Sequence, residues 1–256
     1  MTAYQGGKKR IGKKIHDAMI LVEDDLMSGI KLPYFEPFVG MGGVLRHFGK
    51  DNDRKLSASD INLDLIMMWN ALKKGWTPPL KCSKEKFEKL KYTNTHSAER
   101  AFLGVVASFG TNFFHNYRLH LEPKNKSYLK EGYNGLMDIL PDIKKVKFEH
   151  GDYDEFELEN YLIYCDPPYV NNNLASIHFE KFDHQKFWDV MREWSKNNVV
   201  FISESTAPSD FKKIWSTESY NSNRYKTKRY SDNLYVHKDI YKILSPKIKE
   251  QIKNLA

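Results

Sequence analysis

An acid, two prolines and a tyrosine stand together at residues 166–169, directly after the apolar run YLIYC. The run predicts a buried strand, and the prolines must end it because they lack a backbone N–H and fix φ. The Asp166 carboxylate and the Pro167 carbonyl then offer two hydrogen-bond acceptors on stiff backbone, and Tyr169 offers a flat aromatic face. Together they could hold a planar ring that bears an exocyclic amine. An ordinary strand exit is the alternative, because Asp and Pro are common in turns.

Two acceptors would also activate such an amine. The lone pair of an exocyclic amine on a purine is delocalised into the ring, so the nitrogen is a poor nucleophile. Hydrogen bonds from both amino protons to Asp166 and Pro167 would draw the nitrogen toward tetrahedral geometry. They would strengthen as positive charge develops on the nitrogen during attack.

A glycine loop and a second strand-end acid lie upstream. The segment FVGMGGV follows an expected strand at Tyr34–Val39 and opens a helix, so its backbone can approach a ligand closely. It lacks the Lys of a P-loop and the glycine spacing of the dinucleotide fingerprint. Asp60 ends the next strand about twenty residues later, where an acid can bind ribose hydroxyls. The pair favours an adenosine-containing ligand, with a turn or a helix N-cap as the alternative for Asp60.

The third expected strand ends in HGDY. Asp152 could accept a hydrogen bond from an adenine amino group, and Tyr153 could lie against the ring. A solvated turn explains these two residues equally well.

Strands alternate with helices along both flanks of the chain, which predicts an α/β fold with a doubly wound, mostly parallel sheet. Ligands bind at the carboxyl ends of the strands in such sheets. A closing hairpin, with its turn at Ser231–Asn233, would add an antiparallel edge. We expect helices over IGKKIHDAMILV, LDLIMMWNALKKG, HQKFWDVMREWSKN and PSDFKKIW.

Composition limits the partner and the compartment. Lys and Arg number 40 against 33 Asp and Glu, a formal charge of +7 that suits a polyanionic partner. The basic residues cluster near the N-terminus and between residues 212 and 229. Two distant cysteines fit neither a metal site nor a disulfide framework, and no run has the pattern of a signal peptide or a membrane span. We expect an intracellular, cytoplasmic protein.

The ordered set YQGGKKRI, FVGMGG, DIN and DPPY resembles the S-adenosylmethionine-dependent DNA adenine N6-methyltransferases of the Dam type, the D12 class. The resemblance covers most of the chain. It implies a Rossmann-like catalytic domain, S-adenosylmethionine as cofactor, and no metal. It also implies methyl transfer to N6 of an adenine flipped out of a short specific sequence in double-stranded DNA.

The resemblance assigns roles to individual residues. The catalytic set is Asp166, Pro167 and Tyr169. The cofactor-binding set is Tyr4, Lys8, Phe38, Gly40, Gly42, Asp60, Asp152, Tyr153 and Asp166. The family commonly has Trp where this chain has Tyr4.

The resemblance also divides the chain. Residues 1–76 and 146–256 would form the catalytic domain, and the polar and basic residues 77–145 would form an inserted, mainly helical target-recognition domain. Base edges would be read by Asn112, Asn116 and Arg118, and phosphates would be bound by Lys226, Lys228 and Arg229. Phe113, Phe114 and Tyr117 would wedge into the base stack or form the core of the insert. RNA methylation and a catalytically silent nucleic-acid-binding module are the alternative functions.

Overall fold

The computed structural model describes residues 8–109, 112–169, 182–223 and 226–255. Its strands form one seven-stranded sheet in the order β3-β2-β1-β4-β5-β7-β6. The strands are β1 (Tyr34–Glu36), β2 (Leu56–Asp60), β3 (Lys147–His150), β4 (Leu162–Cys165), β5 (Val199–Glu204), β6 (Phe211–Asn223) and β7 (Lys226–His237). The first five are parallel, and β7 and β6 add an antiparallel edge, as the sequence predicted.

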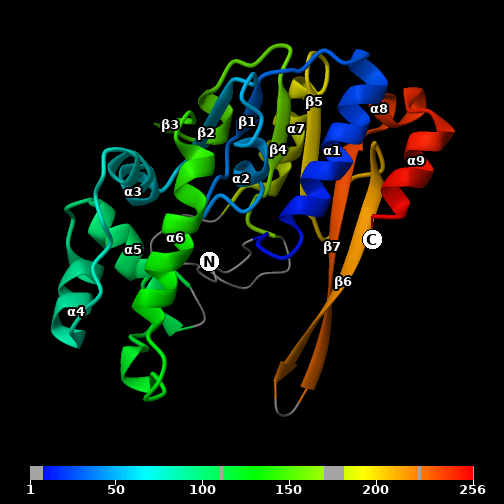
Figure 1. Ribbon diagram of the computed structural model, residues 1–256. Helices are drawn as coiled ribbons and strands as arrows, with labels where there is room; N and C mark the ends of the chain where they lie inside the picture. Colours follow the sequence, from blue (N-terminus) through cyan, green and yellow to red (C-terminus); the bar gives the residue numbers. More distant parts are fainter. Residues whose placement is uncertain (1–7, 110–111, 170–181, 224–225, 256) are drawn as a thin grey trace.

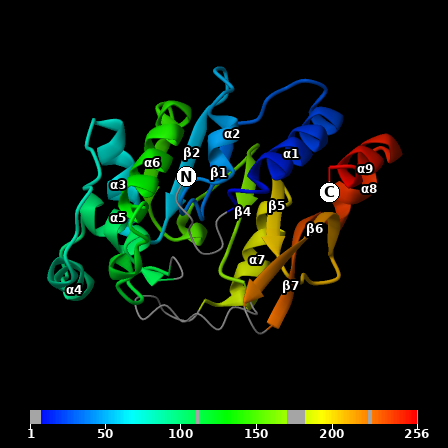
Figure 2. The same cartoon turned by 60° about the horizontal axis from the view of Figure 1, so that its bottom comes forward.

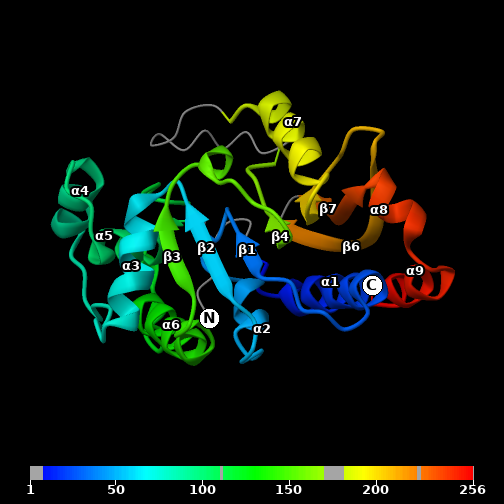
Figure 3. The ribbon, with the colours of Figure 1, turned by 90° about the horizontal axis from the view of Figure 1, so that it is seen from above.

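Helices cover both faces of the sheet. In Figure 3 α7 lies over one face, and α1, α2 and α6 lie over the other. The α-helices are α1 (Gly12–Met27), α2 (Leu45–Phe48), α3 (Leu63–Lys73), α4 (Lys84–Tyr92), α5 (Ala98–Val106), α6 (Tyr128–Ile143), α7 (His184–Trp194), α8 (Lys238–Ile243) and α9 (Pro246–Lys253). Short 3₁₀ turns occupy Leu119–Leu121 and Tyr153–Glu155. The mostly parallel, doubly wound α/β prediction is confirmed.

Strand β4 shows why the apolar run before DPPY is continuous. Leu162 and Tyr164 pack into the core on the α1 side, whereas Ile163 and Cys165 pack into the core beneath α7. Because both faces of this parallel strand are buried, its sequence has no polar alternation. The strand ends at Cys165, directly before Asp166 and the two prolines, which cannot donate to a strand ladder.

The helix that the sequence predicted over PSDFKKIW is wrong, because this segment begins β6. Phe211, Ile214 and Trp215 are all buried, and their spacing of three and four residues resembles a helical face. The pairing of β6 with β7 shifts register between Lys213 and Trp215. This irregularity inserts one residue into the strand, so a β-strand acquires the apolar spacing of a helix.

The predicted hairpin turn at Ser231–Asn233 is also wrong, since these residues lie inside β7 and pair with Ser216–Glu218 of β6. Asn233 uses its amide to donate to the carbonyls of Glu204 and Ser205, so a residue typical of turns here fixes one strand to the next. Strand β7 ends at His237, and α8 begins at Lys238.

The β6–β7 hairpin projects beyond the sheet. Glu204, the last residue of β5, is paired with Asn233, so Lys226–Asp232 of β7 extend past the carboxyl end of β5. Figure 1 shows both strands running well below the others. We call β6 from Thr217 to Asn223 and β7 from Lys226 to Asp232 the arm.

Residues 77–145 contain α4, α5, the turn at Leu119–Leu121 and α6. In Figure 1 α4 and α5 lie beside α3, and α3 packs on β3. Residues of α5 and α6 belong to the same hydrophobic core as β1, β2 and β4. The boundaries of a separate recognition domain stay a prediction.

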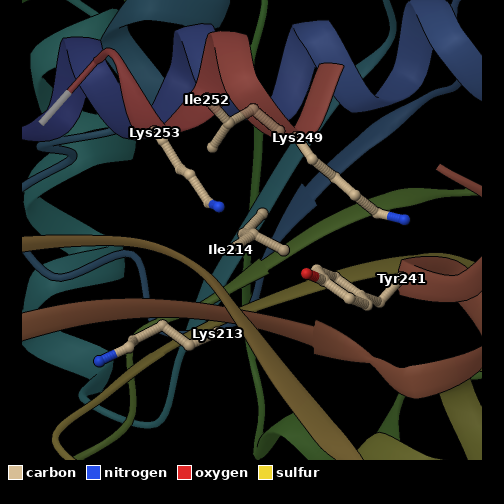
Figure 4. A pocket seen from close by; sticks show the side chains of 6 residues that line it. All are labelled: Lys213, Ile214, Tyr241, Lys249, Ile252 and Lys253. Carbon is tan, nitrogen blue, oxygen red and sulfur yellow. The ribbon is translucent and has the colours of Figure 1, made fainter. Parts of the chain in front are cut away.

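At the C-terminal end of the described chain, α9 packs on β6. Figure 4 shows Ile252 of α9 and Ile214 of β6 facing each other, with Lys213, Lys249 and Lys253 around them. The crevice between them has a volume of about 10 Å³. Such a volume holds one water molecule at most, so this crevice is not a ligand site. Within the described residues, no helix combines the length and the apolar character needed to cross a membrane.

A buried ion pair fixes α1 against the segment that leads into β2. Both side chains are almost fully buried, with Glu23 2% and Arg54 1% exposed. Arg54 donates to Glu23 Oε1 at 2.7 Å and to Glu23 Oε2 at 2.6 Å. The same guanidinium donates to the Leu32 carbonyl, and Glu23 accepts from the Leu32 N–H. Loss of Glu23 would leave the buried Arg54 guanidinium with the longer contact to Asp51, at 3.4 Å from Nε, in place of two short hydrogen bonds.

We therefore expect Glu23→Gln to lower the free energy of unfolding by about 3–5 kcal/mol, measured by guanidinium denaturation. The control is Lys13→Met, which breaks the exposed Lys13–Asp17 pair on the same helix and should cost less than about 1 kcal/mol. Equal losses in the two variants would contradict this account of the buried pair.

Candidate functional site

The carboxyl ends of the parallel strands converge at one edge of the sheet. Glu36, Asp60 and Asp166 stand at or just after the ends of β1, β2 and β4. The strand order reverses between β1 and its neighbour β4, and such a point opens a crevice in parallel sheets. In Figure 2, where the lower end of Figure 1 comes forward, β1 and β4 lie between α4 and α5 on one side and the arm on the other.

Asp166 forms an ion pair with Lys8, from the opposite end of the sequence. Lys8 Nζ donates to Asp166 Oδ1 at 2.7 Å, and the two side chains are 4% and 17% exposed. Lys8 Nζ also lies 4.8 Å from the centre of the Tyr169 ring. The structure thus brings Lys8 together with Asp166 and Tyr169, three residues that the sequence placed in the site.

The base of the arm completes this cluster. Asp232 Oδ1 accepts a hydrogen bond from the Tyr169 hydroxyl at 3.1 Å and lies 3.9 Å from Lys8 Nζ. The Tyr169 side chain is therefore held at two points, with the Lys8 ammonium over its ring and the Asp232 carboxylate on its hydroxyl. Lys8 in turn lies between two carboxylates, with the shorter contact to Asp166.

Burial dominates the electrostatics of the site. It raises the pKa of Asp166 to about 6, although the charge and hydrogen bond of Lys8 oppose that rise. Asp232 and Glu204 add to the rise because a second negative charge nearby disfavours ionisation. Glu36 is fully buried behind Asp166, and burial raises its pKa to about 8. Its carboxyl accepts from the Tyr34 hydroxyl at 2.6 Å.

The glycine loop is tied to Asp60. The two carboxylate oxygens of Asp60 accept from the N–H groups of Gly40 and Asn62, each at 2.9 Å. Gly40 and Gly42 have φ values of +45° and +66°, which explains the need for glycine at both positions. Asn62, not Asp60, caps α3, so the N-cap alternative for Asp60 is wrong. Burial raises the pKa of Asp60 to about 6.

Asp152 and Tyr153 follow β3 at the same edge. Asp152 accepts from the Tyr153 N–H at 2.7 Å, and burial raises the pKa of its carboxyl. The Tyr153 ring is buried among aromatic side chains, with its centre 5.3 Å from that of Phe38. Phe38 is half-buried, so its ring is the more accessible of the pair.

The three predicted base-reading residues lie on one loop that folds back onto the end of α5. Asn116 is exposed, whereas Asn112 is half-buried. Arg118 donates from Nε to the Val106 carbonyl, and its guanidinium lies 4.1 Å from the centre of the Tyr128 ring. Arg118 therefore also holds this loop against α5 and α6. Its role in base recognition stays a prediction.

The aromatic residues of this loop differ in burial. Phe113 and Phe114 are buried in the hydrophobic core, which confirms the core interpretation for these two. Tyr117 is half-buried and donates from its hydroxyl to the Cys82 carbonyl.

Two groups of predicted residues are placed less completely. Tyr4 lies outside the described residues. Lys226, Lys228 and Arg229 lie on the arm, opposite Asn223, Asn221 and Tyr220 of β6.

Sequence reasoning missed three acids around Asp166, which are Glu36, Glu204 and Asp232. Glu36 carried a signal, because it is a charged residue at the end of an apolar strand directly before the glycine loop. Glu204 sits in the same position at the end of β5. Asp232 carried a misleading signal, since its neighbours Ser231 and Asn233 are typical of turns.

The raised pKa of Glu36 predicts how stability depends on pH. Between about pH 4.5 and 8 the folded protein keeps a proton that the unfolded chain releases, so stability falls as pH rises. His47 affects stability in the opposite sense, because burial lowers its pKa to about 4. Its contribution to stability rises with pH only up to about pH 6.5 and is constant above that. We expect the wild-type melting temperature to fall between pH 6.5 and 8, and Glu36→Gln to remove most of that fall.

The glutamine carbonyl can still accept a hydrogen bond from the Tyr34 hydroxyl, so the variant should fold. Glu159→Gln, at an exposed position, is the control and should leave the pH dependence unchanged. Thermal unfolding at several pH values tests both, and a fall of the same size in Glu36→Gln would refute the assignment.

Comparisons with known proteins identify the family. The family model described as D12 class N6 adenine-specific DNA methyltransferase matches residues 4–245. No curated protein sequence matches the chain.

Two solved structures match over most of this chain at low similarity. A candidate RNA methyltransferase from Pyrococcus horikoshii is 12% identical with a TM-score of 0.37, over 86% of this chain and 81% of that one. A candidate methyltransferase in complex with SAH is 11% identical with a TM-score of 0.33, over 91% of this chain and 54% of that one. Both TM-scores lie below 0.5, so neither likeness bears on the substrate.

The family match spans the glycine loop, Asp60, Asp152 and the DPPY segment, and these are the residues that meet at the carboxyl edge of the sheet. The chain therefore belongs to the D12 class N6 adenine-specific DNA methyltransferase family.

Proposed function

We propose that this methyltransferase transfers the methyl group of S-adenosylmethionine to N6 of an adenine flipped out of a short specific sequence in double-stranded DNA. The observation that carries the proposal is the half-buried Asp166 at the tip of β4, held by Lys8 beside the Tyr169 ring. Family membership makes the protein an S-adenosylmethionine-dependent methyltransferase. Duplex DNA, base flipping and the roles of individual residues are the proposal.

The donor set at the edge of the sheet fits the cofactor. Each carboxylate oxygen of Asp60 accepts one backbone N–H, so each retains acceptor capacity for a ribose hydroxyl. Asp152 would accept from the adenine amino group, beside the rings of Phe38 and Tyr153. Lys8 and the loop at Gly40 and Gly42 would surround the rest of the cofactor. When bound, S-adenosylmethionine supplies a methyl group already activated by a sulfonium.

Asp166 would bind and orient the target amine. Within the described part of the chain, its carboxylate is hydrogen-bonded to Lys8 through Oδ1. Its other oxygen and the Pro167 carbonyl would accept the two amino protons, while the Tyr169 ring would stack on the base. These acceptors stabilise positive charge on the nitrogen most when it is fully developed, which favours the transition state over the bound base.

Two features outside the strand tips support a nucleic-acid substrate. The arm extends past the carboxyl edge and includes the basic residues Lys226, Lys228 and Arg229, which would bind phosphates. On the other side of the edge, the loop with Asn112, Asn116 and Arg118 would read bases. A DNA duplex bound across the carboxyl edge of the sheet would reach both the arm and this loop.

Asp166→Ala should lower the rate of labelled methyl transfer to unmethylated duplex DNA by about 100-fold or more, because an acceptor aimed at developing charge is lost. Circular dichroism should show a retained fold. Asp17→Asn, on the exposed side of α1 and away from the strand tips, is the matched control and should keep full activity. Normal activity in Asp166→Ala would refute the mechanism.

The same assay should compare duplex DNA with RNA of matched length. Transfer to RNA in preference to DNA would refute the DNA assignment, and binding of DNA by a protein that does not bind S-adenosylmethionine would indicate a silent module. Sequencing the methylated DNA then gives the recognition sequence.

The raised pKa of Asp166 predicts an acidic limb in the pH profile. Because the carboxylate must be ionised to accept from the amine, kcat/KM should rise through about pH 6. Lys8 lowers the pKa of Asp166, so Lys8→Met should move this limb to higher pH. Lys13→Met on the exposed face of α1 is the control. A limb at the same pH in Lys8→Met would contradict the role of the ion pair.

A further inference from the structure

A groove beside the ends of β2 and β3 opens between the start of α3, the end of α4 and the start of α5. Its volume is about 600 Å³, within the range of about 300–1,000 Å³ usual for ligand pockets. It is lined by Ile61–Asp64, Lys91–Asn94, His96, Arg100, Phe113 and His150. None of the residues assigned above to the cofactor or to the target base lines it, although Ile61 directly follows Asp60.

One wall of the groove is a rigid ion-pair network. Asp64 is 1% exposed and accepts from Arg100 and from the Ser97 N–H. His96 Nδ1 lies 3.3 Å from the same carboxylate. Arg100 also donates to the Leu90 carbonyl, which fixes the end of α4 to α5. The single carboxylate of the groove is thus neutralised by its own wall.

The opposite wall offers a flat ring and a cation. Tyr92 is 73% exposed, and Lys91 Nζ lies 5.4 Å from the centre of its ring. Among the described residues Lys91 Nζ donates one hydrogen bond, to the His115 carbonyl, and an ammonium carries three donor protons, so it can also bind another acceptor. An exposed aromatic ring beside a cation is the combination on which unstacked bases and their phosphates bind.

A buried amide beneath the groove lacks a partner. Asn62 is 6% exposed, and its Oδ1 caps α3 by accepting from the Asp64 N–H. Its Nδ2 has no hydrogen-bond partner among the described residues. Burying a donor without a partner is unfavourable, so a ligand that supplies an acceptor here gains affinity.

We propose that this groove binds one unstacked nucleotide of the DNA substrate outside the target pocket, with its base on Tyr92 and its phosphate on Lys91. The proposal rests on the proposed DNA methyltransferase function. It favours DNA over an apolar partner because the unneutralised charge of the groove is positive. The groove would then hold the strand between the sheet and the helices of residues 77–145.

The test measures binding of a fluorescein-labelled duplex that contains the sequence found by methylation sequencing. Tyr92→Ala should weaken binding about tenfold, since stacking of one base on an aromatic ring contributes about 1–3 kcal/mol. Tyr92→Phe keeps the ring and should bind within about twofold of wild type. Equal affinity in Tyr92→Ala and wild type would overturn the proposal.

The phosphate contact has its own readout. Lys91→Gln should reduce the slope of log K against log salt by about one. Lys84→Gln removes the same charge from the other end of α4, outside the groove, and should leave the slope unchanged. An equal reduction of the salt slope in the two variants would indicate that DNA binds a diffuse basic surface, and it would overturn the proposed phosphate contact.

Calorimetric titration with S-adenosylmethionine in the absence of DNA separates the remaining outcomes. Tyr92→Ala should bind the cofactor like wild type. Loss of cofactor affinity with unchanged DNA binding would assign the groove to the cofactor instead. If wild type neither binds nor methylates DNA, the proposed function fails. If wild type binds and methylates DNA and the groove variants bind it as tightly as wild type does, only the groove proposal is overturned.

Discussion

The ion pair between Lys8 and Asp166 is the interaction on which the site depends. It joins the start of the described chain to the tip of β4, and through Asp232 it reaches the base of the arm. Because the pair is largely buried, the charge of Asp166 is maintained by Lys8 against desolvation and against the neighbouring acids. The carboxylate is therefore poised near pH 6, where a modest change in its surroundings changes its ionisation.

The parallel sheet concentrates this chemistry at one edge. Parallel strands end on the same side, so the loops after β1, β2, β3 and β4 must meet there whatever their distance in sequence. Asp60 shows how the meeting is fixed, since its carboxylate fastens the glycine loop after β1 to the turn that begins α3. The residues that would bind the cofactor are thus also residues that hold the loops together.

The antiparallel edge extends the molecule beyond that site. Pairing of β5 with β7 stops at Glu204 and Asn233, and from there the arm continues without the rest of the sheet. On the other side α5 packs on α3 and α4 packs on α5, and the groove opens among the start of α3, the end of α4 and the start of α5. The strand tips lie between two elements that carry basic residues, an arrangement suited to a long polyanion rather than a small substrate.

The sequence by itself determined the alternating order of strands and helices and the chemistry of the strand tips, because buried strands need unbroken apolar runs and glycine or proline marks their ends. It also determined the family, through DPPY and the glycine loop. It misplaced PSDFKKIW and the Ser231–Asn233 turn, since a register shift gives a strand the apolar spacing of a helix and Asn233 serves a cross-strand contact. Only the tertiary structure decided that Glu36, Glu204 and Asp232 surround Asp166, because long-range strand order, not local pattern, sets which ends become neighbours.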